Sequence, residues 1–271
     1  MRCDLEETAN ANSDARVIEA GRVGLPSTVE SAFRAHLSTS VFSTNATAAK
    51  ILAFHGISEI AHARRLCIHR AGGDVRAGLA NYKVEQGDYF RRRTAFEKLW
   101  KRGRSLLYGA VNSGNLGALD YGEFCLVVED PARLPKAERA VFPGDSAIRY
   151  ASSTGKLRTA KAVKEATAWK DRAELAIVKL ASSIATTHPA GWPELICREG
   201  DYIEVAQIGD IPISAITEVR VGAAYRKTQM DGVARVSQGL PLDDATAMNI
   251  KATDAINRWV DSHKMKIVHV P

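Results

Sequence analysis

The stretch Tyr202-Ile-Glu-Val-Ala-Gln-Ile208 decides the fold of this chain. Successive side chains of a strand point to opposite faces, so Tyr202, Glu204, Ala206 and Ile208 share one face. The opposite face is also largely apolar, which is typical of a strand inside a core. We therefore predict a core β-strand over residues 202–208, with Glu204 as its one carboxylate.

The segments around this strand predict both helices and strands. Aromatic and β-branched residues predict a strand over 121–128, and shorter apolar runs predict strands over 216–221 and 264–270. Apolar residues at helical spacing predict helices over 28–37, 57–65, 156–184 and 243–260, and a helix that begins at Asp88. Residues 49–54 fit a strand or a helix end. Asp145 or Ser146 is expected to cap a helix that runs through Tyr150.

The remaining segments have the composition of loops. Glycines at positions 72, 73, 78 and 87 indicate a loop region, and residues 222–242 read as a polar insertion. Neither a βαβ repeat nor a Gly-x-Gly-x-x-Gly fingerprint is present. We predict one α+β domain over residues 27–271, with helical insertions, after a loosely held N-terminal segment at 1–26.

Composition limits the possible classes of protein. The 271 residues are 45% hydrophobic and 25% charged, as in ordinary globular proteins. No run approaches the roughly 20 apolar residues of a membrane helix, and the first residues lack the apolar region of a secretory signal. The four cysteines form no Cys-x-x-Cys pair, so we expect no metal cluster, no disulfide framework and a reducing, cytoplasmic compartment. The formal net charge of +6 is compatible with a nucleic-acid partner.

Glu204 is the first candidate for chemistry. A carboxylate in an apolar strand costs free energy if it is buried without a partner. Three arrangements remain open from the sequence: an edge-strand glutamate that faces solvent, an ion pair with an arginine, or a functional anion. His55-Gly56 is a second, weaker candidate, because glycine lets the backbone approach a ligand beside a donor and acceptor ring.

A basic helix is the third candidate. Residues 89–104 carry seven cationic side chains, one glutamate and four aromatic rings. Such a segment can follow phosphates while its rings stack on bases, or it can be a solvated face over a buried stripe of Phe96, Leu99 and Trp100. The nucleic-acid interpretation assigns the contacts to the cationic residues Arg91, Arg92, Arg93, Lys98, Lys101 and Arg102.

Several segments, read in order, resemble one enzyme family. The chain over about residues 50–270 is similar to the histidine–tyrosine–glutamate class of ADP-ribosyltransferases, in particular the DarT-type DNA ADP-ribosyltransferases. The similar segments are Phe54-His55-Gly56, the aromatic strand after Asp120-Tyr121, the turn Phe142-Pro-Gly-Asp-Ser146, and residues 203–221 with Glu204. The chain departs from the family after His55, at the family's arginine, and at residues 222–242.

The resemblance implies a fold, a substrate and roles for residues. It implies a mixed β-sheet of the ADP-ribosyltransferase type, NAD⁺ as substrate, no metal, and Glu204 as the catalytic carboxylate. By the same resemblance His55 and Gly56 would hold the adenosine ribose, Arg104 (with Arg102 as rival) would neutralise the pyrophosphate, and Tyr121 would stack on nicotinamide, with Tyr108 and Tyr150 as alternatives. An enzyme of this toxin or defence type would modify a nucleic acid, DNA first, and would be held in check by an antitoxin or immunity partner.

Two ambiguities remain at this level. Arg172-Ala-Glu174 mimics the Ala-Glu of the catalytic strand, but Glu174 lies in helical periodicity, so we prefer Glu204. Two other functions also stay open: a nucleic-acid-binding protein without catalysis, and a metal-dependent nuclease that uses Asp145, Glu174 and Lys179.

Overall fold

A seven-stranded mixed sheet forms the centre of the protein, which we describe from a computed structural model over residues 2–128 and 137–270. Six strands run antiparallel to their neighbours, and only the last pair is parallel. The strand order across the sheet is β5 (Glu138–Phe142), β6 (Glu204–Ile208), β3 (Leu106–Asn112), β1 (Val41–Ala46), β4 (Phe124–Val128), β8 (Ile216–Gly222) and β9 (Lys266–Val270). A small separate sheet pairs β2 (Glu59–Ile60) with β7 (Ile211–Pro212).

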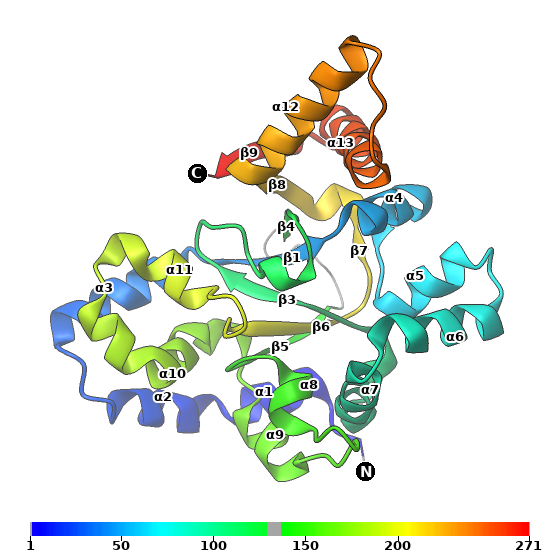
Figure 1. Cartoon of the computed structure of the whole chain (residues 1–271). Helices are drawn as coiled ribbons and strands as arrows, with labels where there is room; N and C mark the ends of the chain where they lie inside the picture. The colour runs from blue at the N-terminus through cyan, green and yellow to red at the C-terminus, as the bar shows by residue number, and fades with distance from the viewer. Residues whose placement is uncertain (1, 129–136, 271) are drawn as a thin grey trace.

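Helices surround the sheet (Figure 1). They are α1 (Leu5–Ala11), α2 (Ser13–Gly21), α3 (Ser27–Ser38), α4 (Ala48–Ile57), α5 (Ala63–Arg70), α6 (Val75–Gln86), α7 (Tyr89–Leu99), α8 (Ser146–Tyr150), α9 (Thr159–Glu165), α10 (Arg172–Thr186), α11 (Trp192–Ile196), α12 (Ala223–Ser237) and α13 (Asp244–His263). Among the helices of the described residues, none combines the length and the apolar character needed to cross a bilayer. The prediction of an α+β fold is confirmed.

The strand that carries Glu204 lies inside the sheet. β6 pairs with β5 on one side and with β3 on the other. Ile203 and Val205 belong to the larger apolar cluster, whereas Ala206 and Ile208 belong to a second cluster that includes residues of α1, α7, α8 and α9. The predicted alternation holds for these four residues, whereas Tyr202, which was expected on the face of Ala206, precedes β6 and packs in the larger cluster.

The N-terminal residues are packed rather than loosely held. Leu5 and Ala9 of α1 are fully buried in the second cluster. The backbone of Cys3 bonds to the end of α7 through Cys3 N–Leu99 O (2.8 Å) and Lys101 N–Cys3 O (2.7 Å). The expectation of a loose segment over 1–26 was wrong for residues 2–26, because a mainly polar sequence hides the few apolar side chains that dock.

Two segments expected to be loops are helical. The glycine-containing segment after Gly73 forms α6. Gly78 is needed for close packing rather than for a turn, because a Cβ at this position would lie 2.4 Å from the backbone Cα of Ile68. Residues 223–237 form α12 within the supposed insertion. Residues 57–65, expected to be helical, contain β2 and only the start of α5. The helix expected to begin at Asp88 is confirmed as α7, over a buried stripe of Phe96, Leu99 and Trp100.

Candidate functional site

Glu204 stands at the start of β6, deep inside the sheet. It lies opposite Phe142 of β5 and Ala110 of β3, and its exposed fraction is 0%. Because strands flank β6 on both sides, the arrangement of an edge-strand glutamate that faces solvent is wrong. Burial of this carboxyl group must therefore be offset by local partners.

The partners of Glu204 are few. Its Oε1 accepts a hydrogen bond from the backbone N–H of Ser146 (3.1 Å). Its Oε2 is buried and has no hydrogen-bond partner among the described residues. Burial, followed by the nearby negative charge of Asp145, raises the pKa of Glu204 to about 8. In this structure the group is therefore mostly protonated at neutral pH, with one oxygen free for another partner.

Asp145 lies next to Glu204 and accepts hydrogen bonds from two tyrosines. It caps α8 by accepting the backbone N–H of Ile148 (3.0 Å), as predicted. Tyr89 donates to both of its oxygens (2.8 and 2.7 Å), and Tyr121 donates to Oδ2 (3.2 Å). Tyr121 and Tyr202 also share a hydrogen bond of 2.6 Å between their hydroxyls. Burial raises the pKa of these three tyrosines, so they act as neutral donors around the carboxylate.

Arg93 closes this group of side chains from α7. Its guanidinium lies over the ring of Tyr108 at 3.5 Å from the centroid and near the ring of Tyr89 at 5.3 Å. The side chain is buried, and its Nη1 has no hydrogen-bond partner among the described residues. Arg93 thus holds a desolvated cation with donor capacity to spare beside two aromatic rings.

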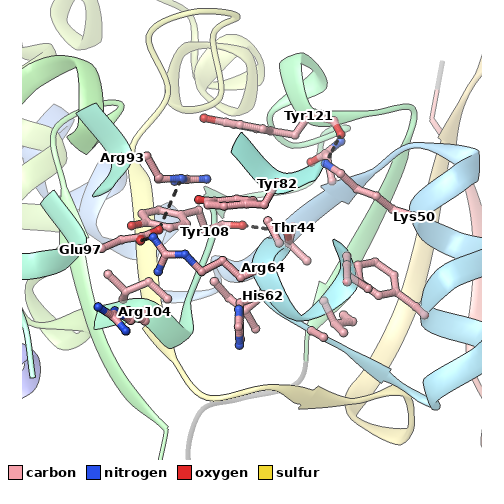
Figure 2. Close-up of a pocket in the computed structure, with 18 residues that line it drawn as sticks. Thr44, Lys50, His62, Arg64, Tyr82, Arg93, Glu97, Arg104, Tyr108 and Tyr121 are labelled. Carbon is pink, nitrogen blue, oxygen red and sulfur yellow. Dashed lines mark hydrogen bonds and ion pairs between the residues drawn. The ribbon is translucent and has the colours of Figure 1, made fainter. Parts of the chain in front are cut away.

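Two adjoining cavities open on this cluster. The larger, about 480 Å³, is lined by Tyr89, Tyr202, Asp145 and residues of α4 and α6. The smaller, about 80 Å³, extends past Tyr108 toward Arg64 and Arg104 (Figure 2). Both cavities are lined by Lys50, Ala63, Leu66, Arg93 and Tyr121, so they form one cleft. Glu204 itself lies just behind the cleft wall, next to residues that line it.

Lys50 is a second cation of the cleft and is half-buried. It belongs to the first turn of α4, and its Nζ donates to the backbone oxygen of Tyr121 (3.4 Å). Burial lowers its pKa, and the positive charges of Arg93 and Arg70 act in the same direction. An anionic ligand would stabilise the charged form of Lys50 beside Arg93 in this cleft.

The smaller cavity is also lined by two arginines of the candidate site. Arg104 lines the smaller cavity and is exposed at its rim. Arg64 also lines it and pairs with the buried Glu97 at 2.5 Å. Tyr150, a rival for stacking, is buried elsewhere and donates to Glu165 (2.8 Å). Of the three tyrosines considered, Tyr121 and Tyr108 line the cleft.

His55 and Gly56 occupy a different part of the fold. They lie in α4, a helix rather than a strand, and His55 Nδ1 accepts a hydrogen bond from Trp259 of α13 (3.1 Å). Neither residue is among those that line the two cavities, whereas His62 lines the smaller one. His62 Nδ1 accepts from the backbone of Arg65 (3.3 Å), which leaves its Nε2 as the donor.

The predicted nucleic-acid residues are divided between several environments. Arg93 is buried in the cleft, Arg92 donates to the backbone of Ala151 (2.6 Å), and Arg102 pairs with Glu138 (3.2 Å). Three others, Arg91, Lys98 and Lys101, are exposed. The basic helix therefore serves the cleft and the packing of α8 as well as the surface.

The alternative glutamate and the nuclease set do not converge. Glu174 lies in α10, as its helical periodicity predicted, and pairs with Arg34. Lys179 pairs with Asp201 (2.8 Å), whereas Asp145 binds Tyr89. Within residues 2–128 and 137–270, no group of three or more His, Cys, Asp or Glu side chains is arranged to hold a metal ion.

Sequence reasoning missed Lys50, Tyr89, His62 and the position of Arg93 in the cleft. One signal was present: Tyr89 and Arg93 are four residues apart on a helix, so they share a face. Lys50 and His62 offered no such signal. Comparison with known proteins adds no assignment, since no protein-family model matches the chain and no curated protein matches it significantly.

Proposed function

We propose that this protein is an NAD⁺-dependent mono-ADP-ribosyltransferase that releases nicotinamide and modifies a nucleic acid. One observation carries the proposal: Glu204 is fully buried behind a cleft of cations and tyrosines, with its Oε2 unpartnered. A buried acid without a partner for one oxygen is costly in a merely structural role. The cost is understandable if that oxygen serves a ligand.

The chemistry of the cleft fits the parts of a dinucleotide. Buried Arg93 and half-buried Lys50 supply two positive charges for the diphosphate, with Arg104 at the rim. Tyr121 or Tyr108 supplies an aromatic face for nicotinamide. The larger cavity alone, about 480 Å³, lies within the roughly 300–1,000 Å³ typical of small-molecule sites.

The proposed reaction breaks the bond between the anomeric carbon of ribose and the nicotinamide nitrogen. The electron pair of that bond leaves with nicotinamide, which becomes neutral, and positive charge develops on the ribose. Ionised Glu204 would stabilise this charge and accept the ribose 2′-hydroxyl proton in a hydrogen bond. The nucleophile of the acceptor then bonds to the anomeric carbon, and its proton passes to Glu204 or to water.

The protonation state of Glu204 fits a site that is completed by its substrate. In the free protein, burial and Asp145 hold its pKa at about 8. The positively charged nicotinamide ring of NAD⁺ would favour the ionised carboxylate, as any opposite charge within about 4–6 Å does. Binding of NAD⁺ would thus generate the anion that the reaction needs.

The acceptor and the setting of the enzyme complete the proposal. The overall charge of +6 favours a nucleic acid acceptor, with DNA as the first candidate over RNA. An enzyme that modifies nucleic acid in its own cytoplasm would need a neutralising antitoxin or immunity partner, in keeping with the family resemblance.

The test is incubation with NAD⁺ labelled in the adenylate part, together with DNA, RNA or protein. Glu204→Gln should lower label transfer by about 10²–10³-fold, the usual loss when one transition-state stabiliser is removed. Glu174→Gln is the matched control and should transfer label normally. Label that survives in Glu204→Gln but disappears in Glu174→Gln would refute the assignment, and Mg²⁺-dependent cleavage without label would favour the nuclease.

The same assay decides between the two histidines. His55→Ala should weaken NAD⁺ binding if the family resemblance extends to this residue. His62→Ala should weaken it if the cleft geometry is the better guide, because only His62 lines the cavity beside Tyr108. The Michaelis constant for NAD⁺ in each variant is the quantity to compare.

A further inference from the structure

A second basic surface lies on α8, α9 and the loop between them. Residues 146–164 contain five cationic side chains and no aspartate or glutamate. The exposed members are Lys156, Arg158 and Lys164, and none of the three makes an ion pair within the described part of the chain. Arg149 and Lys161 pair with Glu165 at the end of α9 (2.6 and 3.8 Å).

A cavity of about 580 Å³ opens beside this surface, between α2, α9 and α10. Cationic side chains outnumber acidic ones among its lining residues. The cations are Arg16, Arg149, Lys161, Lys164 and Lys179, and the acids are Glu19, Glu165 and Asp201. The cavity therefore keeps a positive excess after its ion pairs are counted, which suits an anionic group of nucleotide size.

This cavity and the cleft are lined by neighbouring residues of the same two chain segments. Pro143 and Asp201 line the cavity, whereas Asp145 and Tyr202 line the cleft. Lys179 links the two sites: it lines the cavity, and its Nζ donates to the backbone oxygen of Tyr202 (3.0 Å), which lines the cleft. A chain of phosphates bound in the cavity would therefore pass within a few residues of the cleft.

The lip of the cleft on α8 carries an apolar side chain. Ile148 lines the larger cleft cavity and is 59% exposed, two residues after the N–H donor to Glu204. Figure 1 shows α8 and α9 below the sheet, with α7 on one side and α2 on the other. An apolar contact at the mouth, flanked by cations, matches a nucleotide whose base enters while its phosphates stay outside.

We infer that residues 146–164, with the adjoining cavity, bind the sugar–phosphate backbone of the acceptor nucleic acid and direct one nucleotide into the cleft. This inference rests on the proposed function for its acceptor. The exposed hydroxyls of Ser152, Ser153, Thr154 and Thr159 stand among the cations, as phosphate-contacting hydroxyls do. The acceptor surface is thus α8–α9 rather than the exposed face of α7.

Binding without NAD⁺ tests the surface independently of catalysis. The probes are fluorescent 20-nucleotide single-stranded DNA, single-stranded RNA and duplex DNA, measured by anisotropy across a salt series. The test variant is Lys156→Gln/Arg158→Gln/Lys164→Gln, and the matched control is Arg91→Gln/Lys98→Gln/Lys101→Gln. Both remove three exposed positive charges, so their net charges are equal, and circular dichroism verifies that both are folded.

The expected result is a loss confined to the α8–α9 variant. Three lost phosphate contacts reduce the slope of log K against log salt by about 2, which is up to about 100-fold in affinity at 0.1 M salt. Equal losses in both variants, or a loss only in the α7 variant, would overturn the inference. So would equally tight binding of a poly-glutamate peptide to the same residues, since that would mark a surface for acidic proteins.

Catalysis separates the failure of this inference from the failure of the proposed function. The α8–α9 variant should still release nicotinamide from NAD⁺ to water at the wild-type rate but transfer little label to nucleic acid. Absence of any nicotinamide release from the wild type would refute the proposed function while leaving the binding result to stand. Normal transfer by the α8–α9 variant would refute the surface alone.

Discussion

Replacing Glu204 by glutamine should change how the stability of the protein depends on pH. The buried carboxyl group has a pKa of about 8 in the folded protein, against an ordinary value of 4.5 when it is exposed in the unfolded chain. Between these values the folded state holds a proton that the unfolded state has released. The free energy of unfolding therefore falls as pH rises, at up to about 1.4 kcal/mol per pH unit, and levels off above pH 8.

Over the whole interval this contribution reaches about 5 kcal/mol at most, a large fraction of the stability of an ordinary domain. Glutamine has nearly the same shape and cannot ionise. Relative to Glu204→Gln, the wild type should therefore lose about 2–3 kcal/mol between pH 5.5 and 7.5. Near pH 8.5 the glutamine variant should be the more stable protein.

Urea unfolding followed by tryptophan fluorescence, at half-unit steps from pH 5 to pH 9, measures this difference directly. Contributions from Glu97 and Glu138, whose pKa values burial also raises, occur in both proteins and cancel. Glu174→Gln, which removes a carboxylate paired with Arg34, controls for the loss of one acidic group. Parallel profiles for wild type and Glu204→Gln would show that Glu204 is ionised in the free protein, and the reasoning from burial would fail.

Three further outcomes follow from the same geometry. In the wild type, kcat/KM for NAD⁺ should rise with pH through about 8 as Glu204 ionises. Asp145→Asn should move this inflection to lower pH, because it removes the negative charge beside Glu204. An inflection at the same pH in both proteins would contradict this. Arg93→Met should raise the KM for NAD⁺ at least about tenfold, since it removes a desolvated cation, and an unchanged KM would exclude diphosphate binding there. Gly109→Ala should lower the free energy of unfolding by about 3 kcal/mol, because its Cβ would lie 2.1 Å from a backbone oxygen of β1. Gly21→Ala is the control in thermal melts and should be close to neutral, because nothing lies within 4 Å of its Cβ.

Some strands with apolar side chains were predictable, but the apolar strand β3 and the polar strand β1 were not. β4, β6 and β8 are rich in Val, Ile, Leu and Phe, and their patterns alone indicated them. β1 contains Ser43, Thr44 and Asn45, all buried. Thr44 donates to the backbone of Tyr108 (2.8 Å), and Asn45 donates to that of Leu116 (2.8 Å). Those partners are 64 and 71 residues away, so no local pattern could reveal the strand.

The sequence by itself determined a core strand here, which the structure confines to Glu204–Ile208 of the predicted 202–208, and the oddity of a carboxylate within it. These depend on the order of neighbouring residues, which a strand converts directly into geometry. It also determined that Glu174 belongs to a helix, because that pattern is local too.

Only the tertiary structure decided what surrounds Glu204. Its position between two strands, its nearness to Asp145 and its separation from His55 depend on contacts between segments that are far apart in the chain. Lys50 and Arg93 reach the same cleft from two helices that no periodicity relates. Burial and charge at a site are sums over such distant neighbours, which is why the pKa of Glu204 follows from the fold and not from the strand that carries it.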